Sequence, residues 1–527
     1  MAMADDCDTV VIGSGFGGAV AACRLTQRGD KVVVLERGRR WQTDAFPRGP
    51  GDDWIYDINR PERANGWIDM RVFPDIAVVQ GAGVGGGSLI YANVFVPAQA
   101  AAFADGWPPE ITLAELQPHY ATTGAMLDVA ELPDGQLTGR HRLMRDAAAA
   151  TGNADRLRKL PLAVRFDPAW SYDLPDPHAH HHSSPFVNRH GKAQGTCVHC
   201  GDCDLGCPVG ARNTLDLNYL AVAEAGGADI RPLHMVVGIE PEGRRYRVYF
   251  DRVDQGRRAR DSIVAGRVVL AAGSLNSTEL LLRCRDVLGT LPDLSPRLGQ
   301  GWCANGDFLT LATYGDRSVG PTRGPTITTA VDFLDGSDGG HRYFVEDGGF
   351  PDVVSNALRE MLGRNTVTKR FFRLYERALG ALAGGRPLDG VMPWFGQGAD
   401  ASNGVMRIER DLLDPDGWSL DLEWDPAPSS GVVNALIDRH RQFTRATGGR
   451  IIEPLIWRIF DYLITPHPLG GCGMGTDRTT GVVDHAGEVF GYPRLHVLDG
   501  SIVPRALGLN PSRTIAALAE RNVALMQ

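Results

Sequence analysis

The chain has 527 residues, of which 43% are hydrophobic and 22% charged, and its net charge is −9 at pH 7. This length exceeds the size at which a single hydrophobic core stops growing, so the sequence predicts two domains of an ordinary globular protein. The negative charge, without any dense stripe of Lys and Arg, argues against a role in binding nucleic acid.

Residues 1–6 carry neither the positive segment nor the apolar core of a cleaved signal peptide. No stretch reaches the roughly 18 uninterrupted apolar residues that a membrane-spanning helix needs. We therefore expect a soluble, cytoplasmic protein with no transmembrane segment.

The first forty residues follow the order strand, glycine-rich turn, helix, strand and acid. An apolar strand at 10–12 leads into three glycines at the spacing of a dinucleotide-binding turn, Gly13, Gly15 and Gly18. They allow a tight turn, close approach of the backbone to a pyrophosphate, and close packing of helix on strand. The pyrophosphate would lie at the helix N-terminus, where free N–H groups and the helix dipole favour an anion.

After this turn, a predicted helix at 19–28 and a second apolar strand at 31–35 lead to Glu36. This acid follows Gly18 by eighteen positions and can accept hydrogen bonds from the hydroxyls of an adenosine ribose. The segment predicts an α/β fold with a Rossmann-like dinucleotide-binding domain. It does not separate NAD from FAD.

Residues 41–74 show little periodicity and predict surface loops, and a glycine-rich loop follows at 81–88. The glycines of that loop allow the backbone to approach a large flat ligand, while Ser88 and Asn93 add polar groups. A flexible linker is the alternative, but linkers are not usually followed at once by an apolar stretch such as 89–94. We expect the loop to contact a cofactor.

Further along, hydrophobic periodicity predicts helices and strands in alternation. The expected helices are 113–150, 213–225, 276–283, 359–379, 431–446 and 514–526. The expected strands are 234–240, 245–252, 267–270, 326–333, 404–409, 420–424 and 495–498. The mixture at 306–460 indicates a second domain of α+β type on a largely antiparallel sheet.

Four of the nine cysteines crowd into the run C-x₂-C-x₂-C-x₃-C-P, formed by Cys197, Cys200, Cys203 and Cys207. This is the bacterial ferredoxin spacing, so it predicts an iron–sulfur cluster held by thiolates. A zinc site usually pairs two C-x₂-C knuckles across a longer gap, which makes zinc the second choice. Buried thiols without metal are the third. The nearby histidine tract at 178–182 is interpreted as an exposed loop.

Several motifs, spread in order over almost the whole chain, resemble those of the glucose–methanol–choline (GMC) oxidoreductases, and within them the bacterial cholesterol-oxidase-like branch. These are the Gly13 turn with Glu36, the loop 81–93, the segment 271–274, His-Pro-Leu-Gly-Gly at 467–471, Asp499-Gly500 and Asn510-Pro511. The resemblance implies a discontinuous FAD-binding domain of GMC type, built from 1–40, 215–305 and 465–527. The substrate-binding domain would come from 41–214 and 306–464.

The same resemblance implies the residues that contact FAD. The loop 81–93 would lie along the flavin or its phosphates, Val236 would meet the adenine, and Asp499 with Gly500 would meet the ribityl and flavin end. The full set is Gly13, Gly15, Gly18, Glu36, Gly83, Gly87, Ser88, Asn93, Val236, Gly273, Asp499, Gly500 and Pro511.

The family oxidises alcohols by transfer of a hydride to the flavin, and the resemblance implies His467 as the active-site histidine and Asn510 as its partner. A carbinol must lose its O–H proton as its C–H leaves as hydride, so a proton acceptor is needed beside the oxygen. The amide of Asn510 can orient the hydroxyl without adding charge.

We expect an apolar, ring-bearing alcohol of sterol or terpenoid type as substrate, because of the family branch and of apolar residues such as Trp394 and Phe395. Steroid-oxidising members carry a further glutamate in the substrate domain. This sequence shows no clear counterpart for it, although Asp389 lies in that neighbourhood. Ser512 departs from the sterol oxidases, where a bulky aromatic residue follows Asn-Pro.

The predicted cluster would carry one electron at a time, so it suits an exit from the flavin to a one-electron acceptor protein, as in a dehydrogenase. Three alternatives stay open: an O₂-using alcohol or sterol oxidase with inert cysteines, a flavin-containing electron carrier, and a lyase that uses the flavin only as a scaffold. The pair His467 and Asn510 argues against the carrier.

Overall fold

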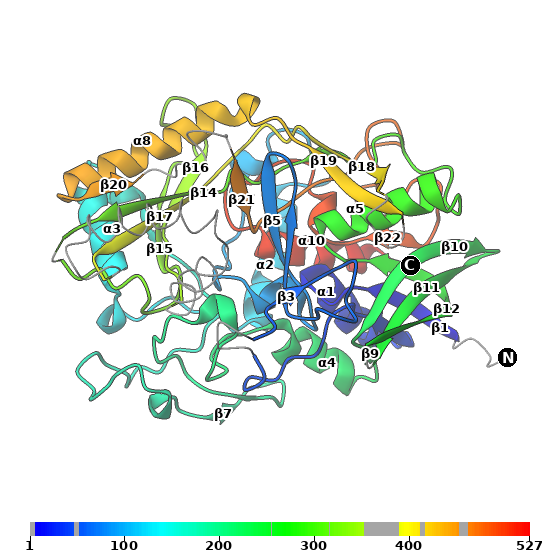
Figure 1. Cartoon of the computed structure of the whole chain (residues 1–527), viewed down its shortest axis with the longest axis horizontal. Helices are drawn as coiled ribbons and strands as arrows, with labels where there is room; N and C mark the ends of the chain where they lie inside the picture. Colours follow the sequence, from blue (N-terminus) through cyan, green and yellow to red (C-terminus); the bar gives the residue numbers. More distant parts are fainter. Residues whose placement is uncertain are drawn as a thin grey trace, which may run out of the picture.

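The computed structural model describes residues 6–46, 52–254, 256–315, 317–351, 389–411, 417–452 and 462–526. Two large sheets dominate it, a seven-stranded sheet at the right of Figure 1 and a six-stranded sheet at the left. Within these ranges, no helix is both long enough and apolar enough to cross a bilayer.

The seven-stranded sheet has the order β10-β11-β12-β1-β2-β9, with β22 also paired to β12. Its strands are β1 (Asp6–Ile12), β2 (Val32–Leu35), β9 (Asp229–Arg231), β10 (His234–Glu242), β11 (Arg245–Asp254), β12 (Arg257–Leu270) and β22 (Leu495–Val497). β1 runs parallel to both β12 and β2, and the paired ends of β1 and β2 are fully buried. Continuous apolar runs are typical of such parallel strands. The predicted Rossmann-like sheet is confirmed.

The strand predicted at 267–270 is the end of the longer strand β12. The first half of β12 carries charged residues and pairs antiparallel with β11, with Ala265 opposite Tyr246. Its second half lies between β1 and β22. Periodicity marked only this second half because it alone is apolar and buried between neighbouring strands.

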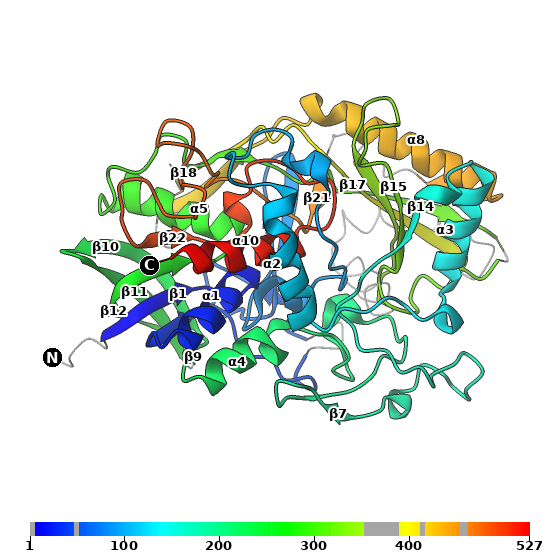
Figure 2. The same cartoon turned by 180° about the vertical axis from the view of Figure 1, so that it is seen from behind.

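Helices pack in a row beside this sheet, as Figure 2 shows from behind. α1 (Phe16–Gln27) packs against α4 (Tyr219–Ala225) and α10 (Ser512–Leu525), and α2 (Leu113–Met126) packs against α10. A further helix, α5 (Ser274–Leu282), follows the end of β12.

Two predicted helices are interrupted. In the region predicted as one helix at 213–225, Asn218 separates a 3₁₀ turn from α4, with φ −137° and ψ −92° and a side chain that accepts from the Tyr219 N–H. The region 113–150 contains two helices, α2 and α3 (Gly139–Ala150), because α2 ends at Met126 and Asp128, directly beyond its C-cap, has a φ of +46°. Periodicity does not detect a single residue that leaves the helical region.

α1 lies so close to neighbouring backbone that no side chain fits beneath it. A Cβ atom on Gly17 would stand 1.5 Å from the carbonyl oxygen of Leu498, and one on Gly18 would stand 2.1 Å from that of Gly13. Gly13 has a φ of +92°, which glycine adopts without strain. These contacts account for the predicted tight turn and close packing of helix on strand.

The six-stranded sheet is antiparallel, with the order β20-β14-β17-β16-β15-β6. Its strands are β6 (Leu157–Lys159), β14 (Phe308–Thr313), β15 (Thr329–Asp332), β16 (Tyr343–Asp347), β17 (Val391–Gly398) and β20 (Arg450–Ile452). α3 and α8 (Ser430–Ala446) pack on it. The predicted second, mostly antiparallel α+β part is confirmed, while the helix expected at 359–379 lies outside the described residues.

Three smaller sheets complete the described fold. One joins β13 (Gln300–Trp302), β18 (Gly404–Arg410) and β19 (Trp418–Glu423), and a hairpin joins β7 (Phe186–Val187) and β8 (Ala193–Gln194). The third joins β3 (Ile55–Tyr56), β4 (Ile68–Val72), β5 (Ile76–Gly81) and β21 (Leu463–Thr465).

The sheet that contains β5 and β21 positions two parts of the candidate site. β5 leads directly into the glycine-rich loop, and β21, which is parallel to β5, ends two residues before His467. β3 and β4 lie in the region 41–74, which the sequence predicts as loop. The pattern does not reveal β4 because this strand has mixed polarity and is only partly buried. All strands of the seven-stranded sheet come from the segments predicted for the FAD-binding domain, whose exact boundaries stay a prediction.

We expect Gly17→Ala to destabilise the fold. The added methyl group has no room against the carbonyl of Leu498, so α1 must shift, and the free energy of unfolding should fall by about 3 kcal/mol or more. Gly135→Ala is the matched control, because a Cβ atom there meets no atom within 4 Å. Denaturant unfolding of both variants measures the difference, and equal stabilities would contradict the packing.

Candidate active site

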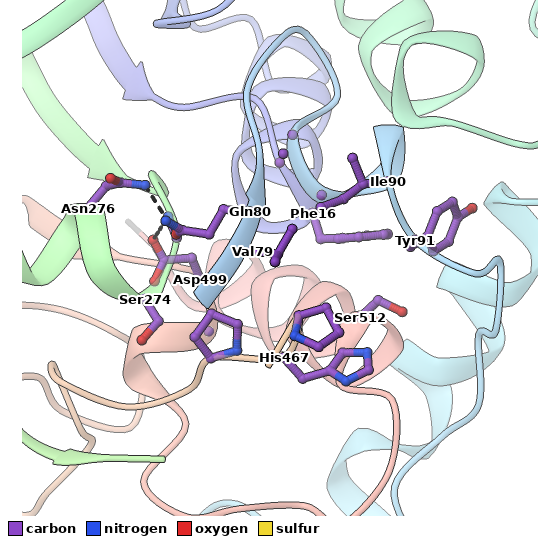
Figure 3. Close-up of a pocket in the computed structure, with 18 of the residues that line it drawn as sticks. Phe16, Val79, Gln80, Ile90, Tyr91, Ser274, Asn276, His467, Asp499 and Ser512 are labelled. Atoms are coloured by element: carbon purple, nitrogen blue, oxygen red, sulfur yellow. Dashed lines mark hydrogen bonds between the residues drawn. The ribbon is translucent and has the colours of Figure 1, made fainter. Parts of the chain in front are cut away.

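A cavity of about 660 Å³ opens at the carboxyl ends of β1, β2 and β12. Ligands of open α/β sheets bind at this edge. The predicted site residues that line the cavity are Gly13, Gly15, Glu36, Gly87, Val236, Gly273, His467, Asp499, Gly500, Asn510 and Pro511. Figure 3 shows Phe16, Tyr91, Asp499 and His467 around this space.

Four predicted cofactor contacts lie outside the lining, Gly18, Gly83, Ser88 and Asn93. Gly18 lies in the first turn of α1 and packs against the carbonyl of Gly13. The hydroxyl of Ser88 donates to the carbonyl of Gly85 at 2.7 Å and accepts from the Leu215 N–H at 3.1 Å, so it ties the glycine-rich loop to the segment before α4. Their contact with FAD stays a prediction.

The N-terminus of α1 faces the cavity, and its N-cap residue offers no side chain to accept hydrogen bonds from the first N–H groups of the helix. Gly15 is the N-cap residue and makes no side-chain cap, and no acidic residue stands in the first turn. A Cβ atom on Gly15 or on Gly87 would meet nothing closer than 4.0 Å, so it would project into open space. Free N–H groups beside an open, glycine-lined space suit a pyrophosphate.

Glu36 holds two glycine-rich segments together at the edge of the cavity. Its side chain is 4% exposed, and one carboxylate oxygen accepts from the N–H and the hydroxyl of Ser14, at 3.1 and 2.6 Å. The other oxygen accepts from the N–H groups of Gly38 and Gly83, at 2.9 and 3.3 Å. Besides its predicted role toward a ribose, Glu36 therefore fixes the loop 81–88 on the first turn.

Asp499 joins the ends of two strands in a similar way. One carboxylate oxygen accepts from the Gly273 N–H at 2.8 Å and from the Ser277 hydroxyl at 2.5 Å, and the other accepts from the Ser501 N–H at 2.9 Å. Burial raises the pKa of Asp499, and these hydrogen bonds oppose the shift. The Asp499 carboxylate thus lies beside the part of the cavity predicted to hold the flavin.

Asn93 and Asn510 carry buried amide atoms that find no hydrogen-bond partner among the described residues. Asn93 has a φ of +66° and is fully buried, and both its Nδ2 and its Oδ1 are such atoms. The Oδ1 of Asn510, which lines the cavity, is also unpartnered. Buried polar atoms are normally satisfied. Together with the glycine-lined space, these free atoms fit a bound cofactor that carries both a pyrophosphate and a polar ring system.

His467 is held by a buried carboxylate. Its Nδ1 lies 2.9 and 3.1 Å from the two oxygens of Asp307, which is 1% exposed. The Thr465 hydroxyl donates to Asp307 at 2.6 Å and accepts from the His467 N–H at 2.9 Å. With Nδ1 engaged, Nε2 is the ring nitrogen for which no described residue supplies a partner. Burial raises the pKa of Asp307, and the interaction with His467 lowers it.

A second acid lies beside Asn510. Glu346, on β16, is fully buried and accepts from the Gln397 amide at 3.0 Å. Burial raises the pKa of Glu346 well above its usual range, the charge of Asp347 adds to this, and the amide of Asn510 opposes it. Burial therefore favours the neutral form of Glu346. The sequence offered no spacing signal for it, and Asp389, the acid considered there, is exposed and outside the cavity lining.

Comparison with known proteins agrees with this geometry. Models of the GMC oxidoreductase family match residues 185–286 and 456–519, and that of an NAD(P)-binding Rossmann-like domain matches 11–50. A cholesterol oxidase of Acinetobacter baumannii is 30% identical over 98% of this chain and 93% of its own. The chain belongs to the GMC oxidoreductase family.

Members of this family bind FAD and act on CH–OH donors. A 2-methyl-1,2-propanediol dehydrogenase of Mycolicibacterium austroafricanum is 25% identical over 98% of this chain and 94% of its own. The crystal structure of pyridoxine 4-oxidase from Mesorbium loti has a TM-score of 0.65 at 17% identity, with 98% of both chains covered, and so shares the fold. The predicted family and its cholesterol-oxidase-like branch are confirmed.

The structure gives no support for the predicted cluster at the four cysteines. Within the described ranges, no three His, Cys, Asp or Glu side chains form a group that could hold a metal ion. Instead, the Cys197 sulfur accepts from the His199 N–H at 3.4 Å, and the Cys207 sulfur accepts from the Ala211 N–H at 3.2 Å. Burial raises the pKa of Cys203 to about 11, which keeps this thiol protonated at neutral pH. The iron–sulfur prediction, with Cys200 as the remaining ligand, has no support in this arrangement.

The cysteine run forms part of the cavity wall instead. Asp204 and Leu205 line the cavity. The guanidinium of Arg212 donates to the carbonyl of Cys203 and, at 2.9 Å, to that of Ser88, which fastens the run to the glycine-rich loop. Burial raises the pKa of Asp204 to about 6. No motif assigned this role to the segment, because it depends on contacts between distant parts of the chain.

We expect protein purified without oxygen to contain no stoichiometric iron, labile sulfide or zinc, because no group of side chains that could hold a metal ion is found in the described part of the chain. Cys200→Ser should leave the visible spectrum and the flavin content unchanged. Metal analysis, a sulfide assay and absorption spectra of both proteins test this. Stoichiometric iron and sulfide that disappear in Cys200→Ser would restore the cluster.

Proposed function

We propose that the protein oxidises an apolar alcohol to a ketone or aldehyde, with FAD as its resident cofactor. The observation that carries the proposal is the ring of His467, which is held by Asp307 in a cavity that Asn510 also lines. Membership of the GMC family supports it.

The residues that would hold FAD follow from the cavity. The N-terminus of α1 and the glycines around Gly15 suit the pyrophosphate, Glu36 lies where a ribose is expected, and Asp499 brackets the flavin end. The unpartnered amide of Asn93 is available to the ring system. Bound FAD would supply the acceptor for the hydride that leaves the carbinol carbon.

The chain itself supplies the proton acceptor. The hydrogen bond from Nδ1 to Asp307 orients the ring of His467, so Nε2 is free to take the O–H proton of the alcohol. Asn510 orients the hydroxyl through its neutral amide.

The neutral state of Glu346 suits this chemistry. A carboxylate beside Asn510 would repel the negative charge that grows on the alcohol oxygen as its proton leaves, whereas a carboxylic acid does not. Burial without a cationic partner keeps Glu346 protonated. The same group can also donate a hydrogen bond to the unpartnered Oδ1 of Asn510.

The walls of the cavity favour an apolar substrate. Leu309 and Ile464 line it and are 45% and 56% exposed, and the ring of Phe395 lies 6.2 Å from that of His467. Trp394, which the sequence suggested as a second wall residue, faces the other side of β17, where its indole N–H donates to Thr444 at 2.9 Å. We propose a ring-bearing alcohol of sterol or terpenoid type, as the cholesterol oxidase relative suggests.

We further propose O₂ as the electron acceptor, so that each alcohol oxidised yields one carbonyl product and one H₂O₂. The cholesterol oxidase relative supports this. A one-electron acceptor protein is the alternative, which the dehydrogenase relative favours.

His467→Ala should slow flavin reduction by an apolar secondary alcohol by about 10²–10⁴-fold, because it removes the proton acceptor. Stopped-flow absorption without oxygen measures this rate, and denaturation of the protein should release a normal amount of fluorescent flavin. His180→Ala, in the exposed part of the histidine tract, is the matched control and should react normally. Near-normal reduction in His467→Ala would remove His467 from the mechanism.

Turnover with O₂ tests the acceptor. We expect one H₂O₂ for each carbonyl formed, at a rate that artificial one-electron acceptors do not exceed. Peroxide and product assays on the same samples provide the ratio. Flavin that alcohol reduces but that O₂ reoxidises much more slowly than one-electron acceptors do would favour a dehydrogenase. Flavin that no alcohol reduces would favour the carrier or the lyase.

A further inference from the structure

The short segment 303–307 contacts His467 and the backbone directly before Asn510. It begins with a backbone pair in which the N–H of Cys303 donates to the carbonyl of Leu469 at 3.0 Å and the N–H of Leu469 donates back at 3.1 Å. Leu469 lies two residues after His467, so this pair fixes the backbone that carries the histidine. At its other end, the segment leads into β14.

Asp307, the last residue of the segment, contacts the histidine side chain. Besides the bonds to Nδ1, its carboxylate accepts from the Thr465 hydroxyl. That hydroxyl also lies 2.9 Å from the carbonyl of Ala304. The ring of His467 is therefore held at Nδ1 by a carboxylate that also accepts from the Thr465 hydroxyl.

Asn305, two residues earlier, contacts the segment that leads to Asn510. Its Oδ1 accepts from the N–H groups of Leu507 and Gly508, both at 2.9 Å, and its Nδ2 donates to the carbonyl of Leu509 at 2.8 Å. The side chain is fully buried and has a φ of +55°, a conformation that Asn tolerates better than most residues. Three bonds thus hold the backbone directly before Asn510.

The segment is itself anchored from outside. The buried carboxylate of Asp400 accepts from the N–H groups of Ala304 at 2.9 Å and Gly306 at 3.2 Å. A Cβ atom on Gly306 would stand 2.4 Å from the carbonyl of Gly398, so the segment lies directly on the end of β17. The side chain of His467 and the backbone before Asn510 are therefore both held by this one anchored segment.

We propose that Asp307 is a positioning residue. Its carboxylate accepts a hydrogen bond from the Nδ1–H group of His467 and thereby leaves Nε2 to receive the hydroxyl proton of the alcohol. The role rests on the proposed function. When the proton reaches Nε2, the ring becomes positive, and the carboxylate offsets that charge across a hydrogen bond of 2.9 Å. Asn305 on the same segment keeps His467 and Asn510 at a fixed separation.

The protonation of His467 can be read without any substrate. With histidine labelled with nitrogen-15, the signal lost in His467→Gln identifies the residue, and we expect its proton on Nδ1, strongly deshielded by the carboxylate. Asp307→Asn should lose that deshielding, and Asp389→Asn, at an exposed aspartate, should retain it. A wild-type proton on Nε2, or an unchanged signal in Asp307→Asn, would overturn the proposal.

Kinetics separate positioning from a structural role. Asp307→Asn should slow flavin reduction roughly 10- to 100-fold, as loss of a hydrogen-bond partner behind a functional histidine commonly does. In His467→Ala, the same change should have no further effect, because Asp307 acts through the ring. Losses that add in the double variant would contradict the proposal.

Asp307→Glu keeps the carboxylate and provides a second variant if Asp307→Asn folds poorly. It should restore the deshielded proton and part of the rate, whereas a rate as low as that of Asp307→Asn would count against the proposal. If no alcohol reduces the flavin, the proposed function fails, and the nitrogen-15 spectra still decide whether Asp307 holds the ring.

Discussion

Buried carboxylates hold the candidate site together, because each of them bonds groups from segments that are far apart in the sequence. Glu36 joins the first glycine turn to the loop 81–88, Asp499 joins the end of β22 to Gly273, and Asp307 joins the start of β14 to His467. An isolated buried charge would be costly, but charge-assisted hydrogen bonds from N–H and O–H groups offset the loss of hydration. The site therefore forms only when the distant segments have met.

This dependence explains what the sequence could predict. The turn at 13–18 and the strand that ends at Glu36 carry their signals within a few tens of residues, and the structure has the strands and helix expected there. Asn305, Asp307 and Glu346 belong to no spacing motif, because their partners lie on other elements. The sequence could supply the ring of His467 but not the carboxylate behind it.

The cysteine run illustrates the opposite case, in which a strong local pattern predicts a cluster that the structure does not support. Spacing allows four sulfurs to converge, but the path of the backbone decides whether they do. Here His199 has a φ of +55°, and the guanidinium of Arg212 donates to the carbonyls of both Cys203 and Ser88, which links the run to the glycine-rich loop. The run is therefore shaped by its contacts with the cavity wall. Trp394 was misassigned for a related reason, since neighbouring residues of a strand face opposite sides.

The two acids nearest the candidate catalytic pair occupy different electrostatic surroundings. Burial raises the pKa of both Asp307 and Glu346, but His467 lowers that of Asp307, whereas the charges of Asp347 and Asp307 raise that of Glu346 further. If one of the two is ionised, it is Asp307, and its charge then makes ionisation of Glu346 still less favourable. Neighbouring acids whose surroundings separate their protonation states commonly divide their roles in catalysis. In the proposed mechanism, an ionised Asp307 would stabilise the imidazole that receives a proton, and a neutral Glu346 would add no charge beside the alcohol.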